Sequence, residues 1–176
     1  EDYLDYDIVT QMNTGDARVR GIEFSYRQAL TFLPTWARGL QVFVNLTHLQ
    51  LKGSNAADFT GFNPRTLSYG VNFIRPRYLV KFTVSDQGET RRTPVAASAT
   101  NPPDTYVWQA AMTRPTLTGE YQFSKYLTVY ATLSDFLGDG FKDVQRTHNP
   151  STPEYAMWSR YQHFGSKLVV GMKGEF

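Results

Sequence analysis

The sequence contains no cysteine, which excludes disulfide scaffolds, thiolate zinc sites and cysteine nucleophiles together. It has no run approaching the roughly 18 to 20 consecutive apolar residues of a membrane-spanning helix. The chain also has little excess of either charge: its net charge is +2 over 176 residues, and its basic residues are scattered. Both observations argue against nucleic acid as a partner. Any membrane role would therefore depend on strands.

Aromatic residues are abundant, at 15% of the chain against 19% charged residues. The mean hydropathy is nevertheless −0.41, the value of a hydrophilic protein. Polar and apolar residues must therefore be interleaved along the chain.

The interleaving has a period of two residues, which is the side-chain period of a β-strand. It recurs in eight segments, and no charged residue occupies the apolar parity of any of them. The apolar positions are Leu4, Tyr6 and Ile8; Ile22, Phe24, Tyr26 and Leu30; Leu40, Val42, Val44 and Leu46; Leu67, Tyr69, Val71 and Phe73; Tyr78, Val80, Phe82 and Val84; Leu117, Tyr121 and Phe123; Leu127, Val129, Ala131 and Leu133; and Leu168, Val170, Met172 and Phe176. The opposite parity is mostly polar, with Phe43, Leu49, Ile74, Leu79 and Val169 as exceptions.

The connections between these segments alternate between long and short. The long ones are "KGSNAADFTGFNP", "DQGETRRTPVAASATNPPDTYVWQAAM" and "GDGFKDVQRTHNPSTPEYAMWSR", and the short ones are "FLPTWARG", "RPR" and "SKY". This alternation predicts an antiparallel up-and-down sheet with long loops at one end and tight turns at the other. A polar face that carries charges and an apolar face that carries none are typical of a transmembrane β-barrel, whose lipid face excludes charge. We therefore expect an all-β fold, an antiparallel up-and-down transmembrane β-barrel wall of about eight strands.

Several motifs, taken in order, resemble the C-terminal part of TonB-dependent outer-membrane receptors. "NTGDARVRGIEFSYRQALTFLP" followed by "GLQVFVNLTHLQ" is similar to their Gly-(Ile/Leu)-Glu strand, Leu-Pro turn and Gly-Leu-x-x-x-x-Asn-x-Thr strand. "FNPRTLSYGVNF" resembles the strand that follows an extracellular loop in the family, and "SDFLGDGF" stands where many members have Asn-Leu-Phe-Asp. The chain's ending resembles the signal that the barrel assembly machinery reads; its residues are Leu168, Val170, Gly171, Met172 and Phe176.

The resemblance implies that residues 1–176 form the C-terminal segment of a barrel of about 22 strands. The family's plug domain and TonB-contacting box lie N-terminal to such a segment, so we expect them to be encoded upstream of Glu1. The implied function is import of a ligand, such as a siderophore or another nutrient, across the outer membrane of a Gram-negative bacterium. The implied partners are outer-membrane lipid, the barrel assembly machinery, the imported ligand and, for the full-length protein, the TonB complex.

Five residues on the polar parity are the candidates for contact with a ligand in the barrel lumen: Glu23, Arg27, Asn45, Asn72 and Glu120. No enzyme is expected, because the sequence has no recognisable catalytic motif. No cofactor and no metal site are expected, because the three histidines are too widely spaced for zinc and the aspartates of "SDFLGDGFKD" miss the EF-hand register.

Two other interpretations fit part of the pattern. A complete eight-stranded outer-membrane barrel with a structural or adhesion role would need a lumen filled by side chains, whereas this polar face is mainly short Ser, Thr, Asn and Gly. A secreted soluble ligand-binding β-sandwich would also have one apolar face per strand, but it requires no asymmetry between its loop ends.

Overall fold

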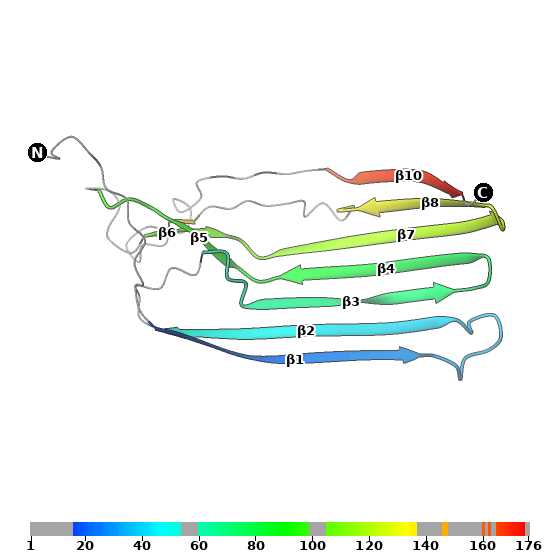
Figure 1. Ribbon diagram of the computed structural model, residues 1–176, viewed down its shortest axis with the longest axis horizontal. Helices are drawn as coiled ribbons and strands as arrows, with labels where there is room; N and C mark the ends of the chain where they lie inside the picture. Colours follow the sequence, from blue (N-terminus) through cyan, green and yellow to red (C-terminus); the bar gives the residue numbers. More distant parts are fainter. Residues whose placement is uncertain are drawn as a thin grey trace, which may run out of the picture.

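The computed structural model describes residues 16–53, 60–98, 105–136, 146–147, 160, 162 and 165–174. These residues form a seven-stranded sheet and a separate three-stranded sheet (Figure 1). No helix able to cross a membrane occurs among them. The all-β prediction is confirmed.

The large sheet is antiparallel throughout, with its strands in chain order. Its strands are β1 (Ala17–Ala29), β2 (Leu40–Gly53), β3 (Arg65–Ile74), β4 (Tyr78–Gln87), β7 (Met112–Ser124), β8 (Leu127–Ser134) and β10 (Lys167–Gly174). They correspond to seven of the eight predicted segments, and the eighth, at residues 4–8, lies outside the described residues. The described sheet is open, because β1 and β10 lie at its two edges and do not pair with each other.

The described residues contain ten strands, three more than the seven of the large sheet. The additional strands are β5 (Thr90–Pro94), β6 (Tyr106–Gln109) and β9 (Arg146–Thr147), and they form the small sheet inside two connections predicted as loops. These strands have only two to five residues, and β5 ends on a proline, so they show no period-two signal. Backbone pairing between them, rather than an apolar face, defines this sheet.

Connection length separates the two ends of the large sheet. The short connections, residues 30–39, 75–77 and 125–126, lie together at the end where β10 also finishes (Figure 1). The strand ends from which the long connections leave, and the small sheet, lie at the other end (Figure 1). The predicted asymmetry is therefore present. We refer to these as the short-turn end and the long-loop end.

Strand register keeps the apolar parity on one face across the whole large sheet. One row of cross-strand neighbours runs from Gln28 through Val42, Val71, Phe82, Leu117 and Leu133 to Leu168. Few apolar side chains in the described chain are buried, namely Ala37, Phe43, Val84 and Pro115. Within the described residues, the large sheet thus has two faces and almost no core, and most of its apolar face is exposed or half-exposed.

Three glycines on the polar face lie directly opposite three of its large side chains. The cross-strand pairs are Gly21 with Leu49, Gly70 with Phe43, and Gly171 with Tyr130. A Cβ added at any of these glycines would run into the facing side chain or into nearby backbone. The glycines therefore let bulky residues lie flat on a face otherwise formed by small polar side chains.

We expect Gly70→Ala to destabilise the protein by about 1 to 3 kcal/mol, because overpacking forces a backbone shift. The new Cβ would overlap the Phe82 carbonyl oxygen and lie 3.0 Å from Phe43 Cε1. The matched control is Gly119→Ala on the apolar face, where no atom lies within 4 Å of the added Cβ. Denaturant unfolding midpoints in detergent should fall for the first variant and stay equal or rise for the second. Equal midpoints for both variants would contradict this assignment.

Candidate functional site

The apolar face is one continuous exposed surface. Side chains from both edges and the centre of the sheet are exposed, including Ile22 at 71%, Val170 at 65% and Met172 at 73%. Along β7 the apolar parity runs from Pro115, which is buried, to Phe123, about 26 Å at the rise of an extended strand. At the long-loop end it stops at charged residues, where Arg65 and Asp86 form an ion pair of 3.7 Å. At the short-turn end, the apolar face ends in exposed aromatic side chains: Trp36, Tyr78, Tyr121, Phe123 and Tyr126.

The five candidate ligand residues all lie on the polar parity, but in different rows of the ladder. Asn45 Oδ1 accepts a hydrogen bond of 2.7 Å from Ser25 Oγ on the neighbouring strand. Asn72 lies opposite Lys81, and its Oδ1 is buried without a partner in the described chain. Arg27 lies opposite Phe43, and Glu23 opposite Thr47. The structure thus places these four on one surface and does not gather them into a single pocket.

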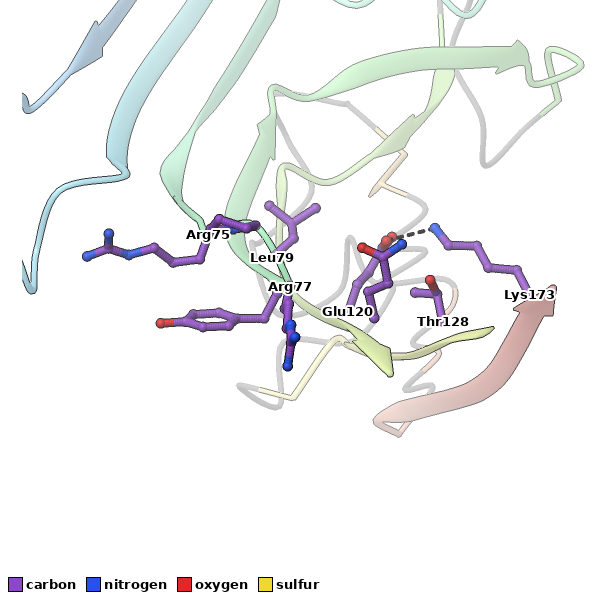
Figure 2. A pocket seen from close by; sticks show the side chains of 9 residues that line it. Arg75, Arg77, Leu79, Glu120, Thr128 and Lys173 are labelled. Atoms are coloured by element: carbon purple, nitrogen blue, oxygen red, sulfur yellow. Dashed lines mark hydrogen bonds and ion pairs between the residues drawn. The ribbon is translucent and has the colours of Figure 1, made fainter. Parts of the chain in front are cut away.

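Glu120 is the exception, because it lines a groove on the polar face at the short-turn end. The groove has a volume of about 260 Å³, and Figure 2 shows Arg75, Arg77, Leu79, Glu120, Thr128 and Lys173 around it. Glu120 Oε2 accepts a hydrogen bond of 2.7 Å from Lys173 Nζ, which comes from β10, two strands away. This ion pair crosses over β8 and ties the last described strand to β7. Its Lys173 side chain is 57% exposed, so the pair contributes at most about 1 kcal/mol.

Arg75 joins two of the short connections at this end. Its Nη2 donates hydrogen bonds to the carbonyl oxygens of Thr35 and Trp36, at 2.6 and 2.8 Å. In Figure 2 its side chain points away from the Glu120 and Lys173 pair, toward the β1–β2 connection. Arg75 therefore fixes the 30–39 connection against the β3–β4 turn.

The predicted C-terminal signal lies partly within the described residues. Leu168, Val170 and Met172 are exposed on the apolar face, as the alternation predicts, and Gly171 lies beneath the Tyr130 ring on the other face. Phe176 lies outside the described residues. These positions fit an edge strand, and their reading by an assembly machine stays a prediction.

The described residues contain no group of three His, Asp or Glu side chains close enough to hold a metal ion. His48 is exposed opposite Ile22 near the long-loop end. The other two histidines, together with Asp139 and Asp143, lie outside the described residues.

Sequence reasoning missed Arg75, and it missed the pairing of Glu120 with Lys173. Neither could be found from alternation, since the first contact involves loop carbonyl groups and the second skips a strand. Only the register of β7, β8 and β10 brings the charges of that pair together.

Comparisons with protein-family models, curated proteins and solved structures found no match to this chain.

We expect Arg75→Gln to release the 30–39 connection, because the variant loses the charged donor to two loop carbonyl oxygens. Trypsin should then cleave after Arg38 several-fold faster, while the unfolding midpoint changes little. Arg77→Gln is the matched control, since the contact known for Arg77 uses its backbone carbonyl oxygen, which accepts from Gln122 N. Equal cleavage rates in the two variants would show that Arg75 does not hold the loop.

Proposed function

We propose that this chain forms part of the wall of a transmembrane β-barrel in a bacterial outer membrane. The observation that carries the proposal is the continuous, exposed, apolar face crossing all seven strands of the large sheet, with a polar face behind it. A sheet with these two faces fits lipid on one side and a water-filled lumen on the other.

The dimensions and charge distribution support the same assignment. At the roughly 40° strand tilt of a transmembrane barrel, the apolar parity of about 26 Å along β7 would span about 20 Å of the membrane, which is comparable with the roughly 25 Å height of a lipid-facing band. Lys or Arg near the bilayer midplane would cost about 2 to 4 kcal/mol. The charged residues on this face lie at the long-loop limit of the band or beyond it: Arg65 with Asp86, and Arg18, Arg20 and Lys52 on β1 and β2. The aromatic side chains at the short-turn end correspond to an interfacial girdle.

Loop length supports an orientation. Barrels of this class have short periplasmic turns and long extracellular loops, so the short-turn end would face the periplasm and the small sheet the outside. The polar face, with Glu23, Arg27, Asn45, Asn72 and Glu120, would line the lumen.

Within this class, the sequence resemblance favours a TonB-dependent receptor that imports a ligand. Its ligand would enter past the long loops, and its strands would be inserted by the barrel assembly machinery. A soluble sandwich requires a second layer over the apolar face, and no described strand packs across that face.

Site-directed spin labelling tests the membrane assignment, because the sequence has no native cysteine to mask. In the full-length protein reconstituted in lipid, with any other cysteine replaced, a nitroxide at Val71→Cys should be accessible to oxygen and shielded from a water-soluble nickel chelate. A label at Asn45→Cys, on the polar face of neighbouring β2, should show the opposite preference. If the Val71 label is shielded from both reagents, the face is a protein core and the proposal fails.

Binding to TonB tests the receptor assignment separately. The immobilised periplasmic domain of TonB should retain the full-length protein from a detergent extract of outer membranes, because receptors of this family couple to it through an N-terminal box. A porin in the same extract is the control and should pass through. If the protein is retained no more than the porin, the receptor assignment fails, while the proposal of a barrel wall still stands.

A further inference from the structure

A pocket lies at the long-loop end, where the small sheet leaves the large one. It has a volume of about 360 Å³, within the range of small-molecule sites. Its floor includes Gln87 and Arg114, from the polar face of β4 and β7, and its wall includes Arg92 of β5 and Gln109 of β6. Neighbouring strands of both sheets therefore build it.

Gln109 has a fixed orientation and an unused donor. Its side-chain oxygen accepts from both Nε and Nη2 of Arg92, the Nε bond being 2.9 Å. Because a guanidinium group can only donate, the amide atom facing Arg92 must be Oε1, and Nε2 must point away from it. Gln109 is only 4% exposed, and its Nε2 is buried without an acceptor in the described chain. A buried donor without a partner is unfavourable, so an acceptor from a ligand would stabilise it.

The other described groups around the pocket are also mainly donors. Arg92 and Arg114 bring two positive charges, and none of the described lining residues is acidic. Asn63 uses its Oδ1 to accept from the backbone N–H of Arg65, at 3.1 Å, which leaves its NH₂ as the group available to a ligand. Thr90 contributes a hydroxyl group. Guanidinium and amide donors around a small cavity match carboxylate or phosphate oxygens.

We propose that this pocket binds a small anion bearing several carboxylate or phosphate groups, with Arg92 and Gln109 Nε2 as its main donors and Arg114 as a further positive charge. This inference rests on the proposed function for its biological meaning: the pocket would be at the extracellular mouth of the lumen and would select an anionic ligand for import.

Calorimetric titration of the full-length protein in detergent tests the pocket, with tricarballylate as the carboxylate probe and inorganic pyrophosphate as the phosphate probe. Binding of either probe supports the site and identifies the chemistry it prefers, whereas binding of neither overturns it. Gln109→Glu should weaken binding at least about tenfold, because it replaces the donor with a carboxylate while keeping an acceptor for Arg92. An unchanged unfolding midpoint in this variant would separate a loss of binding from a loss of folding.

Arg114→Gln should weaken binding by a similar factor. The matched control is Arg91→Gln, which also removes one arginine charge near the pocket. Arg91 lies on β5 next to Arg92, but its side chain lies over the Tyr106 ring and does not line the pocket. It should change affinity less than twofold. An equal loss in the Arg91 and Arg114 variants would mean non-specific attraction and would overturn the proposal. This titration needs neither lipid nor TonB, so its failure is distinguishable from failure of the labelling or TonB experiments.

Discussion

Six antiparallel ladders hold the seven strands of the large sheet in a register that places the apolar side chains of every strand on the same face. A slip of one residue in any ladder would move an entire strand's apolar set to the polar face. The exposed band, the polar surface and the Glu120–Lys173 contact across β8 all require the same pairing. Register is therefore what turns seven separate amphipathic strands into two coherent surfaces.

Register also explains where bulky residues are tolerated on the polar face. Each of Phe43, Leu49 and Tyr130 has a glycine as its direct neighbour, so the side chain lies over backbone instead of projecting outward. This leaves room above the sheet, which a wide aqueous lumen needs and a packed core does not. At the short-turn end, Arg75 joins two adjacent connections through its hydrogen bonds to the carbonyl oxygens of Thr35 and Trp36.

The alternation in the sequence was sufficient to predict the large sheet, because period two over eight or more residues is a strong signal of a two-faced strand. Segments such as 67–73 and 127–133 reappear as β3 and β8 with the predicted faces. The small sheet was missed because β5 and β6 are short, and because the apolar residues of β6 are consecutive instead of alternating. The pocket at the long-loop end was missed for a related reason: Arg92 and Gln109 are 17 residues apart, and only the pairing of β5 with β6 brings them together. For the five predicted lumen residues, the alternation correctly gave the polar face of the sheet. It could not show which of them lie close together, because that depends on the pairing register between strands.

The order of the large sheet has a consequence for how it can close. With an odd number of alternating strands, the two edge strands, β1 and β10, run in the same direction (Figure 1). Joining these edges directly would create a parallel pair in an otherwise antiparallel sheet. An all-antiparallel barrel built on this wall therefore requires an odd number of further strands between β10 and β1, so its total strand number is even. In such a barrel, the seven described strands would form part of the wall and not all of it.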